Sequence, residues 1–247
     1  MRLVTLRERP ELLPALRRIA AAVWPPTMEY IQHDAVCGRH WSALTEHFAE
    51  FQPVLCDRRG RVVAGGYTIP FAWNGRRRAL PMGVDGVLVR GVDDRRRGRA
   101  PTTLSALLAV VDPRQQGRGL SRVVIRAMAT LARRHGLHAL VAPVRPTLKH
   151  RYPLTPMDRY VRWRRPDRAP FDPWLRVHWE LGARVLGVAR RSMVVQGRVE
   201  EWERWTRMRF PASGRYIVPG ALAPVTIDRR RDRGRYAEPN VWMLHSL

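Results

Sequence analysis

The sequence has few cysteines and no long apolar run. Its two cysteines, Cys37 and Cys56, lack the spacing of metal ligands and are too few for a disulfide framework, so no metal site is predicted. The longest apolar stretch, near 104–111, is much shorter than the roughly 20 residues of a membrane helix. The first residues are interrupted by charge and lack the apolar core of a secretory signal. These absences predict a cytoplasmic protein that does not contact a membrane.

Acidic residues and lysine are also scarce. Only 21 acidic residues oppose 45 basic ones, which gives a formal net charge of +24, and Lys149 is the single lysine. Such use of arginine, with abundant alanine, glycine and proline, is typical of GC-rich coding sequence, so part of the basicity is compositional. The rest suits either solvated arginine loops or a surface for nucleic acid, cofactor phosphates or an acidic protein. The arginines cluster at 76–78, 95–99, 159–168 and 229–235.

The centre of the chain has the pattern of a strand–helix–strand unit. Residues 104–111 and 138–144 read as strands, and 117–135 carries apolar residues at helical spacing before Gly136 ends the helix. A connection of this kind places its two strands roughly parallel. Elsewhere the patterns predict strands at 2–7, 52–57 and 61–73, helices at 10–24, 33–51 and 173–181, and an arginine-rich surface excursion over 74–103.

The turn of this unit, "VDPRQQGRGLS" at 111–121, joins a strand end to a helix start. Unpaired backbone N–H groups and the positive end of a helix dipole meet at such a point, which makes it an anion site. Gly117 and Gly119 let the backbone approach an oxygen-bearing group. The third glycine of a dinucleotide fingerprint and the Gly-Lys-Ser/Thr of a P-loop are both missing. The turn therefore suits a pyrophosphate, or is simply a tight turn.

The same segment resembles the acyl-CoA loop of the GNAT (N-acetyltransferase) superfamily, whose signature is V-x-P-x-x-[QR]-x-x-G-x-[GA]. Val111, Pro113, Gln116 and Gly119 fall on this signature, and Ser121 replaces its last small residue. The predicted order of elements over 2–195 is similar to the family as well. The resemblance implies an α/β fold with a mixed, largely antiparallel sheet, a splayed parallel strand pair and flanking helices. The domain would span 1–195, and 196–247 would form a β-rich extension packed on it.

The resemblance also implies a reaction. Members move an acyl group, here expected to be acetyl, from a CoA thioester to an amine, and the expected acceptor is a small molecule that attacks the thioester directly. Backbone amides would hold the pyrophosphate, arginines would reach the phosphates, and the strand end would pair with the pantetheine arm. The cofactor residues implied in this way are Val111, Gln116, Gly117, Arg118, Gly119, Leu120, Ser121 and Arg122.

A candidate general acid follows from the helix at 173–181. Asp172 as N-cap, Pro173 at the first position and Gly182 as the stop predict this helix. Family members often end it with Y-x-x-x-G-F, in which the tyrosine protonates the leaving thiolate. Counting back four residues from Gly182 gives His178, which can transfer protons near neutral pH or can simply be a hydrogen-bonded histidine. Phe171 stands where the family often has an asparagine, so one pantetheine contact is missing.

Two segments carry candidate residues for binding the acceptor substrate. The segment 143–170, rich in proline, aromatic residues and arginine, suits an ordered lid; in it Tyr152 is a second catalytic candidate and Lys149 a substrate-binding one. In the connection "PPTMEYIQHDAV", Asp34 would orient His33 as a base near the substrate, or "HDAV" simply caps the next helix.

The sequence is also compatible with other functions and partners. An acyl carrier protein in place of CoA would use the same pantetheine arm and would suit the basic surface. A nucleic-acid-binding protein on the same scaffold, or an acceptor carried by RNA, would use the excess arginine. A homodimer is a further alternative.

Overall fold

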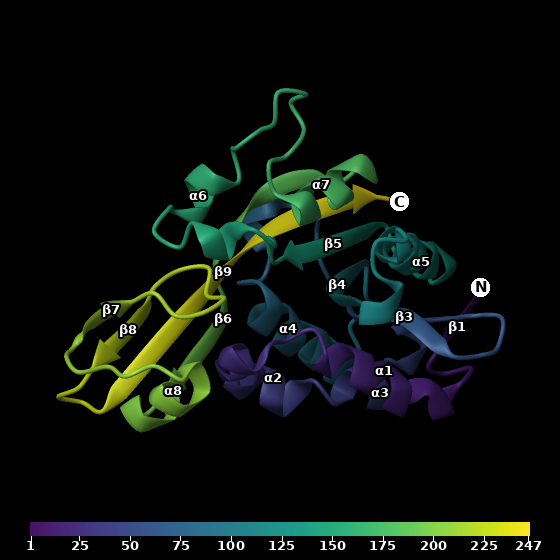
Figure 1. Cartoon of the computed structure of the whole chain (residues 1–247). Coiled ribbons are helices and arrows are strands. Elements are labelled where there is room, and N and C mark those ends of the chain that lie inside the picture. The colour runs from purple at the N-terminus through teal and green to yellow at the C-terminus, as the bar shows by residue number, and fades with distance from the viewer.

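The computed structural model describes all residues, 1–247, and is built on one nine-stranded sheet in the order β1-β2-β3-β4-β5-β9-β8-β7, with β6 also paired to β9 (Figure 1). The only parallel pair is β4–β5. This confirms the predicted mixed, largely antiparallel sheet. The strands are β1 Arg2–Thr5, β2 Pro53–Cys56, β3 Val62–Phe71, β4 Thr103–Val111, β5 Ala139–Val144, β6 Arg184–Gly197, β7 Gly214–Tyr216, β8 Val225–Asp228 and β9 Arg233–Ser246.

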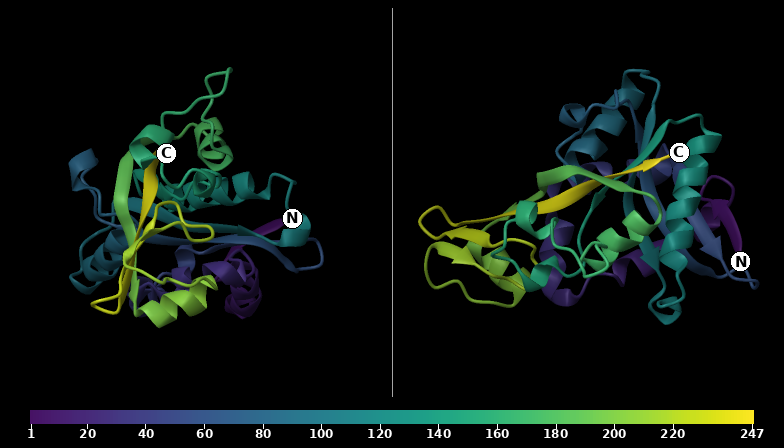
Figure 2. Two further views of the ribbon diagram at one scale, coloured as in Figure 1. Left: turned by 60° about the vertical axis from the view of Figure 1, so that its left-hand side comes forward. Right: turned by 90° about the horizontal axis from the view of Figure 1, so that it is seen from above.

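Helices cover both faces of the sheet (Figures 1 and 2). Side chains at successive positions of a strand point to opposite faces, and on β3 the position of Gly65 abuts Leu16 of α1 while that of Gly66 abuts Met128 of α5. The helices are α1 Leu13–Ala21, α2 Ala35–His40, α3 Ala43–Glu46, α4 Val84–Arg96, α5 Leu120–Arg134, α6 Met157–Tyr160, α7 Pro173–Glu180 and α8 Val199–Thr206. Short 3-10 turns are η1 Pro10–Leu12, η2 Pro26–His33, η3 Ala49–Phe51, η4 Arg77–Ala79, η5 Pro113–Gln115 and η6 Lys149–Arg151.

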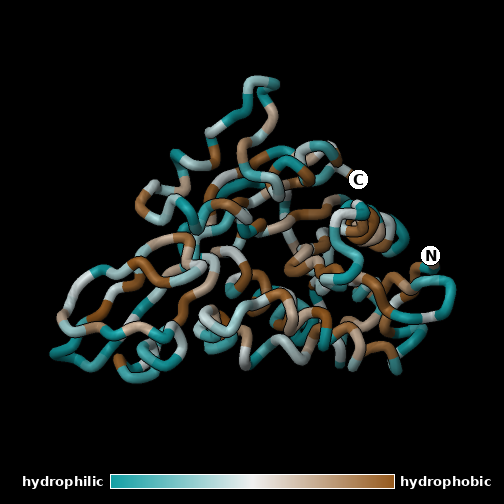
Figure 3. Tube along the Cα trace, in the orientation of Figure 1, coloured by the Kyte–Doolittle hydropathy of each residue, from teal (hydrophilic) through white to brown (hydrophobic).

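Two predicted elements differ from the structure. The helix expected over 33–51 is divided into α2, α3 and η3, because the carbonyls of Trp41 and Ser42 accept bonds from N–H groups three residues on, which tightens the helix there. The arginine-rich stretch 74–103 is not only a surface excursion. It contains α4, whose Val87 and Leu88 are fully buried. The hydrophilic residues of this stretch lie mostly near its ends. In Figure 3 the outer loops of the protein are mostly hydrophilic, and hydrophobic segments are more frequent toward its centre.

The C-terminal residues supply a central strand of the sheet. The expected boundary at 195/196 falls inside β6, and β9 lies between β5 and β8. β6 and β9, 14 residues each, extend beyond the rest of the sheet and carry β7, β8 and α8 (Figures 1 and 2). Trp202 and Trp205 pack α8 onto this extension in a second apolar cluster.

β4 and β5 separate toward their C-terminal ends. They are paired only from Thr103 to Ser105, opposite Ala139 to Val141. Directly afterwards the register of β4 against β3 shifts, because Thr68 pairs with Ala106 and Tyr67 with Leu108, which leaves Leu107 as a bulge. The bulge turns β4 away from β5 and opens a gap in the sheet.

No helix of the protein has the length and apolar character that a bilayer crossing requires.

Candidate functional site

Two adjoining cavities occupy the gap between β4 and β5. The inner cavity, about 430 Å³, is lined mainly by apolar residues, including 106–109 of β4, 142–144 of β5 and His178. The outer cavity, about 700 Å³, is lined by the turn before α5 and by residues of the segment 23–28. Both cavities share the lining residues Trp24, Leu108, Ala109, Arg145 and Trp174. The two cavities therefore adjoin, and together they define a route from the surface turn to the centre of the sheet.

The outer cavity collects most of the predicted cofactor residues. Its lining includes Val111, Gln116, Gly117, Gly119, Leu120 and Ser121. Arg118 and Arg122 lie outside it: Arg118 donates to Gln115 Oε1 over 3.0 Å, and Arg122 pairs with Glu180 of α7. These two arginines fix neighbouring parts of the protein and do not face the cavity.

The turn before α5 has the form of an anion cradle. Gly117 and Gly119 have φ of 77° and 71°, in the left-handed region that favours glycine. Gly119 is the N-cap of the 15-residue helix α5, and no side chain caps that end. A Cβ at either glycine would meet no atom within 4 Å, so the turn faces open space. The first amides of α5 are therefore available to an anion such as a pyrophosphate.

Asp172 holds α7 beside the inner cavity. Its carboxylate accepts from the backbone N–H groups of Trp174 (2.9 Å) and Leu175 (3.2 Å), which confirms the predicted N-cap. It also accepts from the Leu148 N–H and the Tyr160 hydroxyl, both over 2.8 Å. The cap thus ties α7 to the segment that follows β5. As a result, Trp174 and His178 of α7 line the inner cavity.

His178 forms a buried pair with His245 of β9. Nδ1 of His178 lies 2.9 Å from Nε2 of His245. Burial lowers the pKa of His178 to about 3, and the neighbouring His245 contributes to this decrease. Burial also lowers the pKa of His245, to about 4. Both rings are therefore neutral at neutral pH. Nε2 of His178 is the ring nitrogen that this pair leaves free.

An ion pair lies between the cavities. Nε of Arg145 is 3.0 and 3.1 Å from the two carboxylate oxygens of Glu238, which is buried. The Tyr236 hydroxyl donates to the same carboxylate over 3.1 Å. Arg145 also donates to the Gly220 carbonyl and lies 5.4 Å from the centroid of the Trp24 ring. The pair is thus compensated on both sides, as a buried charge requires.

Lys149, Tyr152 and His33, which the sequence suggested as site residues, lie outside both cavities. The ammonium of Lys149 is buried and donates to the carbonyls of Tyr152 (2.8 Å) and Leu222 (2.5 Å), and burial lowers its pKa to about 8. The Tyr152 ring packs against Trp163, with centroids 4.9 Å apart. His33 stacks on Trp205 at 4.3 Å. Lys149 and Tyr152 thus tie the segment 143–170 together and do not face the route.

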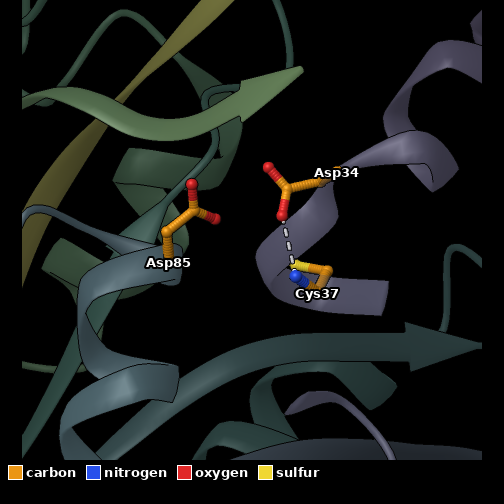
Figure 4. Close-up of side chains that lie close together, drawn as sticks. All are labelled: Asp34, Cys37 and Asp85. Carbon is orange, nitrogen blue, oxygen red and sulfur yellow. Dashed lines mark hydrogen bonds between the residues drawn. The ribbon is translucent and has the colours of Figure 1, made fainter. Parts of the chain in front are cut away.

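Asp34 caps α2 and does not orient His33. Its carboxylate accepts from the Cys37 N–H over 2.7 Å, as the capping alternative predicts. The Val194 N–H lies 3.1 Å from Asp34 Oδ2 and 3.0 Å from Asp85 Oδ2. In Figure 4 the side chains of Asp34, Cys37 and Asp85 point toward one another, and one potential ligand atom of each lies within 4.8 Å of the others. Burial, helped by Asp34, raises the pKa of Asp85 to about 8, so Asp85 holds a proton at neutral pH.

The protonated Asp85 makes stability depend on pH. An unfolded aspartate has a pKa of about 3.9, so between pH 4 and 8 the folded state holds a proton that the unfolded chain has lost, and the free energy of unfolding falls as pH rises. Asp85→Asn removes this loss. We expect the variant to be more stable than the parent by about 1–3 kcal/mol at pH 8, after allowance for solvent screening, and by little at pH 4. Urea denaturation at both pH values measures the difference. Asp93→Asn, at a partly exposed position of α4, is the matched control, and an equal effect of Asp85→Asn at both pH values would contradict the assignment.

The sequence did not reveal several residues of the site. His245, Glu238 and Asn240 all come from β9, and no local pattern links them to β5 or α7. A strand at the far end of the chain reaches the centre of the sheet only through tertiary pairing. The one available signal was the spacing of Glu238 and Asn240, because side chains two positions apart on a strand point to the same face.

Comparisons with known proteins relate the chain to an acetyltransferase by sequence and to GNAT-like domains by fold. No family model matches the chain. The chain is 32% identical over 276 residues to "Arginine N-acetyltransferase avaD" of Aspergillus versicolor, covering 99% of this chain and 93% of that protein. The fold is similar to the loading GNATL domain of CurA from Lyngbya majuscula, with a TM-score of 0.63 at 14% identity over 99% and 96% of the two chains. It is also similar to the GphF GNAT-like decarboxylase in complex with isobutyryl-CoA, with a TM-score of 0.58 at 18% identity over 100% and 99% of the two chains.

Proposed function

Because this chain belongs to the GNAT superfamily of N-acetyltransferases, and is therefore an acyltransferase, we propose that it transfers an acetyl group from acetyl-CoA to an amine of a small cationic molecule of the arginine type. The observation that carries the proposal is the route of two adjoining cavities from the glycine turn before α5, through the gap between β4 and β5, to His178. The arginine N-acetyltransferase at 32% identity supports the class of acceptor.

The residues of the route fit an acyl-CoA. The free amides at the start of α5 suit its pyrophosphate, and the separated part of β4 offers main-chain groups to the pantetheine arm. When bound, acetyl-CoA supplies an acetyl group activated as a thioester. Trp174 lines both cavities and would hold the arm where they join.

His178 is the proposed proton carrier. The new N–C bond forms as the C–S bond breaks, which leaves a proton on nitrogen and an electron pair on sulfur. The free Nε2 of neutral His178 would take the proton from the amine and pass it to the sulfur. Negative charge developing beside the ring opposes the effect of burial on its pKa during this step.

Main-chain N–H groups of β4 would stabilise the negative oxygen of the reacting carbonyl. Val111, at the end of β4, lines the outer cavity only. Leu107 and Leu108, at the bulge, line the inner cavity together with His178. We therefore place the oxyanion contact at the bulge.

The alternatives named from the sequence remain predictions. They are a carrier-protein donor, a nucleic-acid partner, a homodimer and a cytoplasmic location. A donor arm attached to a carrier protein would use the same route, so the donor is decided by whether free acetyl-CoA suffices.

Two measurements test the proposed function. We expect titration calorimetry to show one acetyl-CoA bound per chain, because the route offers one anion cradle and one arm channel. With arginine added, free CoA thiol should be released and N-acetylarginine should appear in equal amounts by mass spectrometry. Absence of binding to acetyl-CoA and to longer acyl-CoAs would overturn the donor assignment. Binding of acetyl-CoA without acetylation of arginine or of other amines that carry a guanidinium would overturn the acceptor assignment.

A further inference from the structure

Asn240 has an unusual position in the inner cavity. Five buried side-chain N or O atoms of the protein have no hydrogen-bond partner, and of their residues only Asn240 lines one of the two cavities. Asn240 is 2% exposed, and its unpaired atom is the amide oxygen Oδ1. Leaving a buried carbonyl oxygen unpaired costs free energy, because the oxygen loses its hydrogen bonds to water without gaining others. A ligand in the cavity that brings an N–H group would remove this cost.

The orientation of the Asn240 amide is set by the strand beside it. Its Nδ2 donates to the carbonyl of Pro143 on β5 over 3.0 Å, so the nitrogen is engaged and the oxygen is the free end. Pairing of β5 with β9 stops at Val144 opposite Val241, next to Asn240. On its other side β9 faces an irregular part of β6, where three residues of β6 lie opposite a single residue of β9. Asn240 therefore lies where β9 loses regular partners on both sides.

Glu238 adds negative charge on the same face of β9. Side chains two positions apart on a strand point to one side, and both Glu238 and Asn240 line the inner cavity. Arg145 and Tyr236 occupy three of the roughly four acceptor positions of the carboxylate. One position remains for a further donor. The cavity thus presents an amide oxygen and a carboxylate from one face of one strand.

The remaining walls suit a flat cation. Trp41 and Trp174 line the same cavity, and Arg145 already lies over the Trp24 ring at 5.4 Å. A guanidinium is planar, carries five N–H donors in a fixed fork, and stacks on aromatic rings. A primary ammonium offers donors but no flat face.

We propose that Asn240 determines acceptor specificity: its Oδ1 accepts a hydrogen bond from the guanidinium of the acceptor, beside the Glu238 carboxylate and the tryptophan walls. This inference rests on the proposed function and names the residue that selects its acceptor. Lys149, His33 and Asp34, the candidates from the sequence, lie outside the cavity in which Asn240 is found.

The test compares two acceptors that differ only at the end of the side chain. Arginine carries the guanidinium, and norleucine has the same α-amine on an aliphatic chain. We expect Asn240→Leu to lower the ratio of kcat/KM for arginine over norleucine by roughly 10- to 100-fold, because a hydrogen bond to a charged group is lost. Calorimetric binding of acetyl-CoA should stay within about twofold of the parent, which also reports that the variant is folded.

A second variant separates recognition from support of the strand. Asn240→Asp loses the donor to Pro143 but keeps an acceptor oxygen, so recognition of arginine should persist although the strand contact is gone. Equal loss for both acceptors, or equal loss in both variants, would overturn the role of Asn240 and leave the proposed function standing. If the parent binds acetyl-CoA but acetylates no amine that carries a guanidinium, and calorimetry with CoA present detects no arginine binding, the guanidinium assignment itself is wrong.

Discussion

We expect replacement of Gly119 by glutamate to abolish the binding of acetyl-CoA. The N-terminus of α5 has no side-chain cap, and Gly119 faces open space at the outer cavity. A carboxylate placed there would occupy the free amides and repel the pyrophosphate. Titration calorimetry should detect no heat of binding at concentrations that saturate the parent protein.

Gly60→Glu is the matched control for backbone strain. Gly60 has φ of 77°, also has no atom within 4 Å of a Cβ, and lies in the turn between β2 and β3. Both substitutions force a non-glycine residue into the left-handed region, at about 1–2 kcal/mol. Similar losses of stability with loss of binding only in Gly119→Glu would establish the cradle. Unchanged binding in Gly119→Glu would refute the placement of the pyrophosphate.

We expect replacement of His178 by alanine to lower kcat by about 100-fold or more. This value is the lower end of the rate contribution that a proton-transferring side chain typically makes. The binding of acetyl-CoA should change little, because the glycine turn and β4 are untouched. Stopped assays of CoA release give kcat, and circular dichroism reports the fold. His138→Ala, an exposed histidine outside both cavities, is the control. A kcat within twofold of the parent would show that His178 does not carry the proton.

The same assignment predicts the pH profile. Burial keeps the pKa of His178 at about 3 and that of His245 at about 4, so both rings remain neutral, and able to accept a proton, from pH 8 down to 5. Titration of His178 therefore does not reduce kcat in this range, as a histidine of ordinary pKa near 6.5 would. The fall of kcat/KM at low pH should follow protonation of the acceptor amine and should shift when an amine of different pKa is used.

Local signals in the sequence were sufficient for the elements that carry the cofactor turn. The apolar stripe of α5, its glycine turn and the flanking strands depend on residues within one stretch, 103–144, and all appear as predicted. The Asp172 cap and the proline after it placed α7, and hence His178, because helix capping acts between neighbours. The sequence by itself thus determined the family resemblance, the glycine turn before α5 and the position of one of the two histidines.

Tertiary structure alone decided which side chains share the inner cavity. β9 enters between β5 and β8 and brings Glu238, Asn240 and His245 to residues 67 or more positions away, and the pairing of distant strands leaves no local periodicity to read. The same holds for residues adjacent in the chain. The His33 ring stacks on Trp205, whereas the Asp34 carboxylate accepts from the N–H groups of Cys37 and Val194, so two neighbouring residues contact different parts of the protein. The sequence determined local elements through short-range bonds, and only the long-range packing of those elements decided which side chains line the proposed acceptor end of the site.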